Sequence, residues 1–169
     1  MREYLSEAVV LRLEPQGVQD GRAYLFTKKF GKLTARVKSL RKITSKLAGH
    51  LQVGHTARVR LIEKRGLQLT DALKTGRVGA PPPALFVLEK ILAEAGPDKE
   101  VWQILQAEQF SWLRMLRVLG WDPTRAVCGI CRRPPQAFDL SSQSYLCRSC
   151  ASKMPPNGLI YVQYNAPNA

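Results

Sequence analysis

The first 75 residues alternate between apolar and polar side chains with the two-residue period of β-strands. Gly31 and Gly66 stand between neighbouring runs, where glycine favours a turn. Five short strands in about 75 residues, expected to pair antiparallel, predict a small barrel such as an OB-fold. The predicted strands lie within residues 8–13, 24–27, 32–40, 57–61 and 67–70.

From residue 85 onward the spacing of apolar residues changes to that of helices. Leu85, Leu88, Leu92 and Ala95 share one face of a first helix, which the Gly-Pro pair at 96–97 ends. A second apolar stripe predicts one helix over residues 98–119, ending at a glycine.

A proline-rich segment at residues 79–83 separates the strand pattern from the helix pattern and predicts a domain boundary. We therefore expect an α+β protein: a five-stranded OB-fold domain (1–78), a small helical domain (79–124), and a four-cysteine zinc module with a short polar tail (125–169).

The charge is strongly positive and uneven. The formal net charge is +13, and residues 1–75 hold 16 of the 26 basic side chains but only 6 of the 13 acidic ones. Such a bias predicts a polyanionic partner, because it far exceeds what solubility requires.

Within this half, residues 28–46 contain eight basic residues and no acidic one. On the strand at 32–38, the period of two places Lys32, Arg36 and Lys38 opposite the apolar side, and Arg58 and Arg60 extend the stripe from a neighbouring strand. Such a stripe suits a phosphate backbone bound without regard to sequence, and the alternative is an ordinary solvated surface. The predicted nucleic-acid-binding residues are Lys28, Lys32, Arg36, Lys38, Arg41, Lys42, Lys46, Arg58 and Arg60.

The four cysteines form two CxxC pairs, Cys128 with Cys131 and Cys147 with Cys150, separated by fifteen residues. This spacing is typical of structural Zn²⁺ sites, and the alternative is a redox pair. A closed site of four thiolates leaves no position for substrate, so the metal is expected to stabilise a small fold and to do no chemistry.

Several classes of function are disfavoured. The chain has no run of about 18 apolar residues and no signal-peptide pattern, so a cytoplasmic protein is expected. It also lacks clustered carboxylates, a phosphate-binding glycine loop and a nucleophile with its base, so we expect no enzymatic activity.

Taken together, these segments resemble the RecO family of bacterial recombination mediators. The resemblance is carried by residues 7–11, 25–27, 30–33, 37–42 and 45–52, and most specifically by residues 110–131, where Leu-Gly-Trp-Asp-Pro leads into the first CxxC. Family members often have glycine where Ser39 stands, and they usually continue with more helices beyond the second CxxC, whereas nineteen residues follow Cys150 here.

The resemblance implies an OB-fold, a helical domain and a zinc module. It further implies binding of single- and double-stranded DNA, strand annealing, and help in loading recombinase, with RecR and the single-stranded-DNA-binding protein as partners at the nucleoid. From the residues alone, two other classes stay open: an RNA-binding or ribosome-associated zinc protein, and an assembly adaptor.

Overall fold

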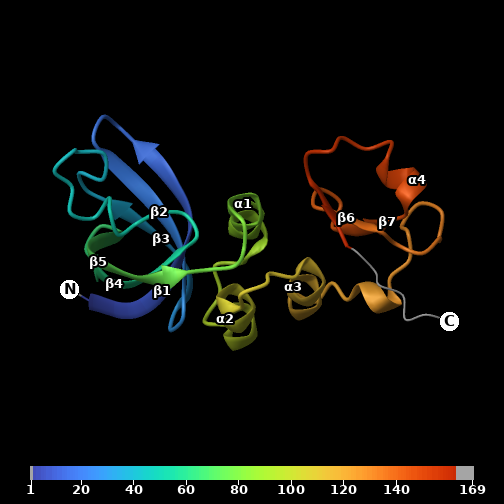
Figure 1. Ribbon diagram of the computed structural model, residues 1–169, viewed down its shortest axis with the longest axis horizontal. Helices are drawn as coiled ribbons and strands as arrows, with labels where there is room; N and C mark the ends of the chain where they lie inside the picture. Colours follow the sequence, from blue (N-terminus) through green and yellow to red (C-terminus); the bar gives the residue numbers. More distant parts are fainter. Residues whose placement is uncertain (1, 163–169) are drawn as a thin grey trace. The chain divides into compact units, whose positions relative to one another are not determined.

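The computed structural model describes residues 2–162, which form two compact units (Figure 1). The first unit ends at Phe110 and the second begins at Ser111. Each unit has its own sheet and its own buried residues, and each is described separately below.

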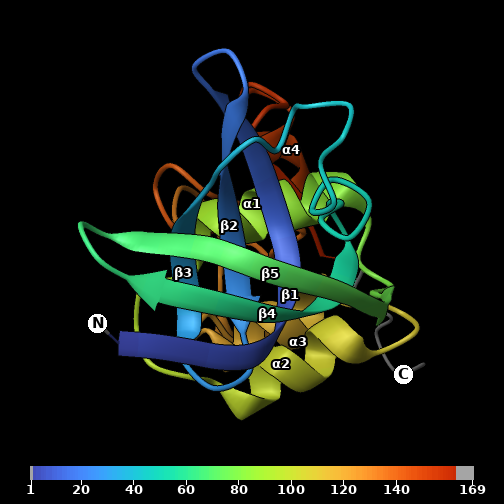
Figure 2. The same cartoon turned by 90° about the vertical axis from the view of Figure 1, so that its left-hand side faces the viewer.

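Five strands of the first unit form a closed barrel in the order β1-β2-β3-β5-β4 (Figure 2). Antiparallel pairing of β1 with β4 closes it, and this confirms the predicted five-stranded OB-fold class. One pairing differs from the all-antiparallel expectation, since β3 and β5 run parallel through Arg36 opposite Gln68 and Val37 opposite Leu69. The strands are β1 (Arg2–Gln16), β2 (Asp20–Thr27), β3 (Gly31–Val37), β4 (His55–Glu63) and β5 (Leu67–Arg77).

The barrel interior is filled by small and branched apolar side chains at alternate strand positions. On β4, Ala57, Val59 and Leu61 are buried, whereas Arg58 and Arg60 are exposed. This is the pattern expected of a strand with one face on a core and the other in solvent. The cationic residues between the core positions are therefore held outward by the same alternation that fills the barrel.

Two helices complete the first unit. Helix α1 (Pro82–Ile91) begins with proline in its first turn, where no amide donor is needed, and it buries Leu85 and Leu88. Helix α2 (Lys99–Gln106) is capped by the carboxylate of Asp98, which accepts from two backbone amides of the first turn. Gly31, with φ of +72°, lies so close to the segment after α1 that an added Cβ would overlap the backbone there.

The predicted single helix over 98–119 is wrong, because the chain leaves helical geometry after α2. Ala107 has an extended backbone, and Ser111 caps a new helix, α3 (Trp112–Val118), by accepting from the amide of Arg114. Helices α2 and α3 belong to different compact units. The predicted three-part division at residues 79 and 125 consequently differs from the two units observed.

The second unit contains α3, a 3-10 turn η1 (Pro123–Arg125), a small three-stranded sheet and the short helix α4 (Arg148–Ala151). The sheet has the order β7-β6-β8, from β6 (Ala137–Asp139), β7 (Ser144–Leu146) and β8 (Leu159–Tyr161). Phe138 is fully buried between the rings of Trp121 and Tyr145. Strand β8 was not predicted, because its residues fall in the segment that was expected to end in a short polar tail.

Within residues 2–162, none of the helices combines the length and the apolar character that crossing a membrane requires.

Candidate nucleic-acid interface and metal site

Four of the predicted binding residues lie exposed on or beside the connection between β3 and β4, which spans residues 38–54 (Figure 2). None of them forms an ion pair within the described chain, residues 2–162. Their charges are thus available to an external anion. We call this set the loop cations: Lys38, Arg41, Lys42 and Lys46.

The start of this loop is fixed by the β1–β2 turn. The Asp20 carboxylate accepts from the Ser39 amide at 2.9 Å, and the Arg41 amide donates to the Gln19 carbonyl at 2.9 Å. Hydrogen bonding to the Ser39 amide, followed by that to Arg36, holds the pKa of Asp20 below its usual value. Ser39 has φ of 54°, in the left-handed region that favours glycine, so the turn itself explains why glycine suits this position.

Three further predicted residues are exposed but paired with carboxylates. The Lys28 ammonium lies 2.9 Å from Glu7, and the Arg36 guanidinium lies 2.6 Å from Asp20. Arg60 donates two hydrogen bonds to Glu3. Solvent-exposed pairs of this kind contribute little stability, so a phosphate can replace the carboxylate at small cost.

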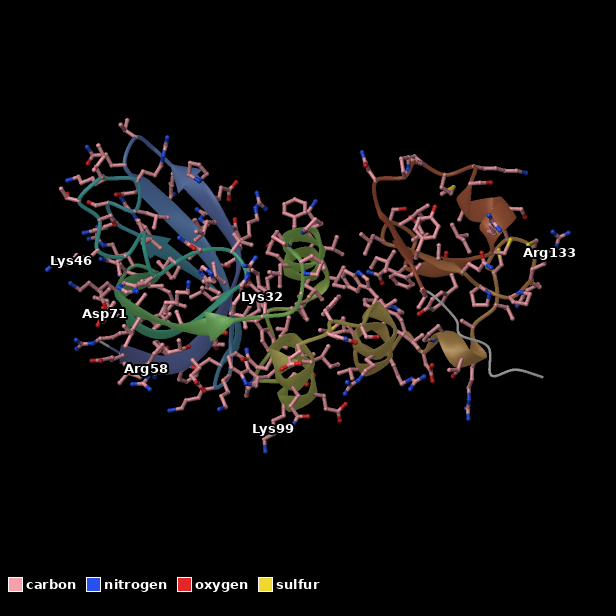
Figure 3. All side chains as sticks on the ribbon, in the orientation of Figure 1. Lys32, Lys46, Arg58, Asp71, Lys99 and Arg133 are labelled. Carbon is pink, nitrogen blue, oxygen red and sulfur yellow. The ribbon has the colours of Figure 1, made fainter. Side chains whose placement is uncertain are left out.

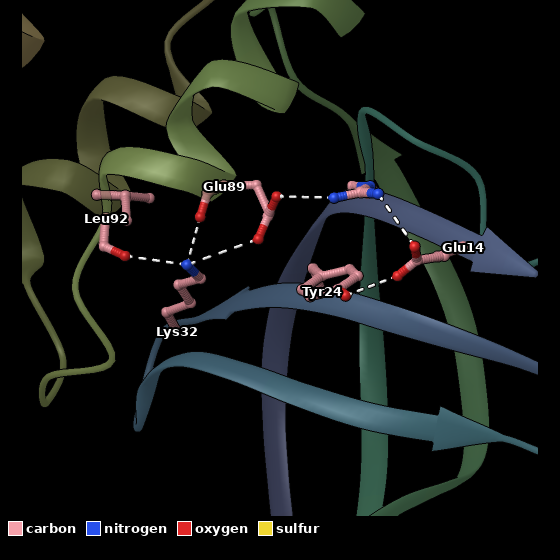
Figure 4. A network of polar contacts seen from close by, with 6 residues as sticks. Glu14, Tyr24, Lys32, Glu89 and Leu92 are labelled. Atoms are coloured by element: carbon pink, nitrogen blue, oxygen red, sulfur yellow. Dashed lines mark hydrogen bonds and ion pairs between the residues drawn. The ribbon is translucent and has the colours of Figure 1, made fainter. Parts of the chain in front are cut away.

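Lys32, which was also predicted to contact nucleic acid, does not belong to this exposed set. Its side chain is only 9% exposed, and its ammonium lies 3.7 Å from the Glu89 carboxylate. The ammonium also donates to the carbonyl oxygens of Glu89 and Leu92, at the end of α1 (Figure 4). Helix ends leave such carbonyls without intrahelical partners, so Lys32 satisfies α1 and attaches it to the barrel.

The contacts of Glu89 continue across the outer surface of β1 and β2. Arg12 lies 3.3 Å from Glu89 and 3.2 Å from Glu14, and the Tyr24 hydroxyl donates to Glu14 at 2.7 Å (Figure 4). Tyr24 also lies beneath the Arg12 guanidinium. Lys32 and Arg12 therefore both form their ion pairs with Glu89 inside the protein.

The predicted continuous stripe is also interrupted. Strand β4, which carries Arg58 and Arg60, is not a neighbour of β3, because β5 lies between them. Arg60 of β4 stands opposite the acidic residue Asp71 of β5. Figure 3 labels Asp71 and Arg58. The exposed cations therefore form at least two groups: the loop cations, and Arg58 with Arg60 in the middle of β4.

The second unit brings the four predicted metal ligands together. Their sulfur atoms all lie within 4.8 Å of one another. The Cys131 sulfur is 3.5 Å from that of Cys147 and 3.7 Å from that of Cys150. A Zn²⁺ ion with Zn–S bonds of about 2.3 Å sets tetrahedral sulfur pairs roughly 3.8 Å apart, so the sulfurs fit this ion.

Hydrogen bonds within the two CxxC turns favour thiolates. Burial raises the pKa of Cys128, but the backbone amides of Cys147 and Cys131 outweigh it, and the pKa lies below its usual value. The Ser149 hydroxyl and the Cys150 amide lower the pKa of Cys147 to about 6. The adjacent Cys147 sulfur raises the pKa of Cys150 to about 12, because so many sulfurs cannot all ionise without a cation among them.

Comparison with known families concerns the first unit. Residues 1–76 match the family described as "Recombination protein O N terminal". The barrel is a RecO N-terminal domain. The match confirms the resemblance to the RecO family over the barrel, and it supports a RecO-like protein of recombination and repair.

The RecO N-terminal domain contains all nine predicted nucleic-acid-binding residues, and it ends before α1. The matched region also holds exposed cations that the sequence analysis did not select. Arg22 of β2 stands directly opposite Arg36 of β3, and Lys29 lies in the β2–β3 turn. Arg22 alternates with buried neighbours, so the sequence pattern could have identified it as an exposed cation. A further exposed cation, Lys99, lies outside the matched region, and its position depends on tertiary packing.

Proposed function

We propose that this protein binds single- and double-stranded DNA through its RecO N-terminal domain and promotes the annealing of complementary strands. It would also assist the loading of recombinase, and it would act without enzymatic turnover. The observation that carries the proposal is the RecO match over a barrel whose four exposed loop cations form no ion pair within residues 2–162.

The loop cations suit contact with phosphates rather than with bases. They are long, flexible cations on a loop whose start is fixed at Ser39 by the β1–β2 turn. Neutralised phosphates release condensed counterions, so affinity falls with salt in proportion to the contacts made. Contacts of this kind carry no sequence information, which suits a protein that pairs arbitrary strands.

The paired cations Lys28, Arg36 and Arg60 would join on binding, as their carboxylates are replaced by phosphates. Arg58 needs no such exchange, because it forms no ion pair within residues 2–162. Annealing requires two strands to be held near each other with their mutual repulsion reduced. Separate groups of cations on one barrel support that role.

We infer that the four cysteines hold one structural Zn²⁺. Cys147 and Cys150 lie at the start of α4, Cys128 and Cys131 lie before the sheet, and the four sulfurs can fill a tetrahedral ion's coordination. Bound there, the ion would stabilise a unit whose sheet has strands of only three residues. Arg133 and Arg148 lie close enough to this centre to offset the negative charge of four thiolates on a dication, and Arg133 is labelled in Figure 3.

The proposed partners follow from the family. RecR and the single-stranded-DNA-binding protein are candidates, and a role in recombination would place the protein with the nucleoid in the cytoplasm. An RNA-binding role is the competing possibility, because OB barrels serve both nucleic acids.

The test compares DNA binding and strand annealing in a variant with all loop cations changed to glutamine. Binding of single-stranded DNA, titrated at several salt concentrations, should lose about 2.8 from the slope of log affinity against log salt, at about 0.7 for each of four contacts. Annealing of complementary oligonucleotides should slow in parallel. A matched control changes Lys64 and Arg65, two exposed cations in the β4–β5 turn, to glutamine.

If the loop variant and the turn control lose the same slope for each cation removed, the loop has no special role and only net charge matters. If the wild-type protein fails to accelerate annealing, the proposed function is refuted. Competition between single-stranded RNA and DNA of equal length decides the remaining choice, and tighter RNA binding would favour the RNA class.

A further inference from the structure

A cavity of about 570 Å³ opens in the first unit where β1, β4 and the β2–β3 turn meet α2. Leu5 and the indole of Trp102 are its main apolar walls. The volume falls within the range of small-ligand pockets, roughly 300–1,000 Å³. Two of the predicted binding residues, Lys28 and Arg58, line it, but its apolar walls were not part of the predicted surface.

The walls of the cavity are fixed before any ligand arrives. The Lys28 amide donates to the Glu7 carbonyl at 2.9 Å, and the Lys29 amide donates to the Ser6 hydroxyl at 3.2 Å, so the β2–β3 turn is attached to β1. Trp102 is held by α2 and is only 9% exposed. Such a pocket needs little rearrangement to accept a rigid group.

The rim of the cavity is cationic. Four lysine and arginine side chains line it, against a single carboxylate, Glu7, which pairs with Lys28. The Lys28 ammonium also lies 5.9 Å from the centre of the Trp102 ring. The other three cations form no ion pair within residues 2–162 and come from three different elements: Lys29, Arg58 and Lys99. Figure 3 shows Arg58 on the barrel and Lys99 on α2, on the same side of this unit.

We propose that this cavity takes one unstacked base of a single-stranded nucleic acid, with the flanking phosphates on Lys29, Arg58 and Lys99. The inference rests on the proposed nucleic-acid binding and adds a specific subsite to it. An apolar wall that includes an indole suits the face of any base, and stacking on aromatic rings does not depend on sequence. Cations on three elements suit a sugar-phosphate backbone, which enters on one side of the base and leaves on the other. The terminal carboxylate of a peptide would need only one cation.

Holding a base out of its stack also fits annealing, because a strand bound in this way cannot keep its own secondary structure at that point. The subsite would then present the neighbouring bases for pairing with a second strand. The part of its affinity that comes from the base does not depend on the number of phosphates, which separates this part from the contribution of the loop cations.

The experiment compares a short oligothymidylate with an abasic oligonucleotide of the same number of phosphates. The wild-type protein should bind the abasic strand about tenfold more weakly, with the same salt slope. Leu5→Trp, which fills the cavity without changing charge, should reduce this difference to less than about twofold. Leu73→Trp is the matched control, because Leu73 is as exposed as Leu5, at 54%, and does not line the cavity.

A second measurement does not depend on a variant. An oligonucleotide carrying 5-iodouracil, cross-linked by light to the wild-type protein, should be found on the peptide that contains Trp102. Cross-links only on other peptides would overturn the inference.

Equal binding of both strands by a protein that still binds DNA would remove the subsite and leave the proposed function standing. No binding of either strand would instead refute the proposed function. A difference that survives in Leu5→Trp would place base recognition elsewhere. The remaining outcome is that affinity does not depend on the base, while the protein binds an acidic peptide with an aliphatic side chain and Leu5→Trp abolishes that binding. The occupant of the cavity would then be a protein, and the proposal would be wrong.

Discussion

Replacing Lys32 by methionine distinguishes its structural role from the DNA contact that its place in the basic run suggested. Methionine keeps the length and apolar stem of the side chain but removes the ammonium. The change takes away the partner of two carbonyl oxygens at the end of α1 and one cation beside Glu89. Because the lysine and glutamate side chains are only 9% and 10% exposed, solvent does not replace these contacts easily.

The magnitude follows from the distances. A charge pair 3.7 Å apart in an effective dielectric of about 20 attracts by roughly 4 kcal/mol before desolvation. Desolvation of the lysine offsets part of this, and Glu89 keeps Arg12 at 3.3 Å. Each orphaned carbonyl adds about 1 kcal/mol. We expect Lys32→Met to lower the free energy of unfolding of the first unit by about 2–4 kcal/mol.

The assay is peptide-resolved hydrogen exchange of the barrel strands, which reports on the first unit even if the second unfolds separately. Affinity for single-stranded DNA is measured beside it and should stay within about twofold of the wild type. Lys38→Met is the matched control, because Lys38 is exposed just beyond the same strand. It should leave stability within about 0.5 kcal/mol and weaken DNA binding. If Lys32→Met weakened DNA binding and left exchange protection unchanged, the assignment of Lys32 to the attachment of α1 would be refuted.

Three further predictions test separate features. The pKa of Asp20, followed by NMR, should lie below the ordinary carboxyl value and rise only part of the way in Arg36→Ala, because the Ser39 amide contributes more. The pKa of Asp20 is lower in the folded protein than in the unfolded chain, so its carboxylate stabilises the fold at pH values above the ordinary carboxyl pKa. This stabilisation is lost as the pH falls through the folded pKa of Asp20. An unshifted pKa would refute this prediction. Cys147→Ser should abolish stoichiometric Zn²⁺ in purified protein and exchange protection in the second unit, and retained metal would exclude the four-sulfur site. Gly31→Ala should destabilise the first unit by about 2 kcal/mol or more, by denaturant titration, because φ is +72° and the new Cβ meets backbone; an unchanged midpoint would contradict this.

The barrel was predictable because its strands have one face inside and one outside. Residues 57–61 alternate strictly, and their exposed arginines and buried aliphatic residues were placed correctly from the sequence. The full length of β1, from Arg2 to Gln16, was not predicted. Its ends carry charged and polar residues that pair with β4 and β2 in the barrel, and its register shifts between Val10 and Arg12. Pairing across strands extends β1 where its own sequence has no apolar run.

The helix break before Ser111 escaped prediction for a related reason. An apolar stripe over residues 98–119 fits one long helix, and a serine at 111 that caps a new helix has the same polarity as a serine on an exposed helix face. Only the extended backbone of Ala107 and the second unit's separate packing show that two short helices are present. Apolar periodicity identifies which face of a helical segment is buried, but not whether the segment forms one continuous helix or two.

The sequence did not show where a charge is satisfied by a distant part of the chain. Lys32 and Lys38 lie on the same predicted face, and no local pattern distinguishes them. What separates them is Glu89, more than fifty residues later, which the fold brings to Lys32 and not to Lys38. The same reasoning applies to the cavity, since Lys99 joins Arg58 only through packing of α2 on the barrel. A run of basic residues therefore predicts the sign of a partner's charge. Tertiary contacts with acidic side chains and helix ends decide which of these cations remain free to bind that partner.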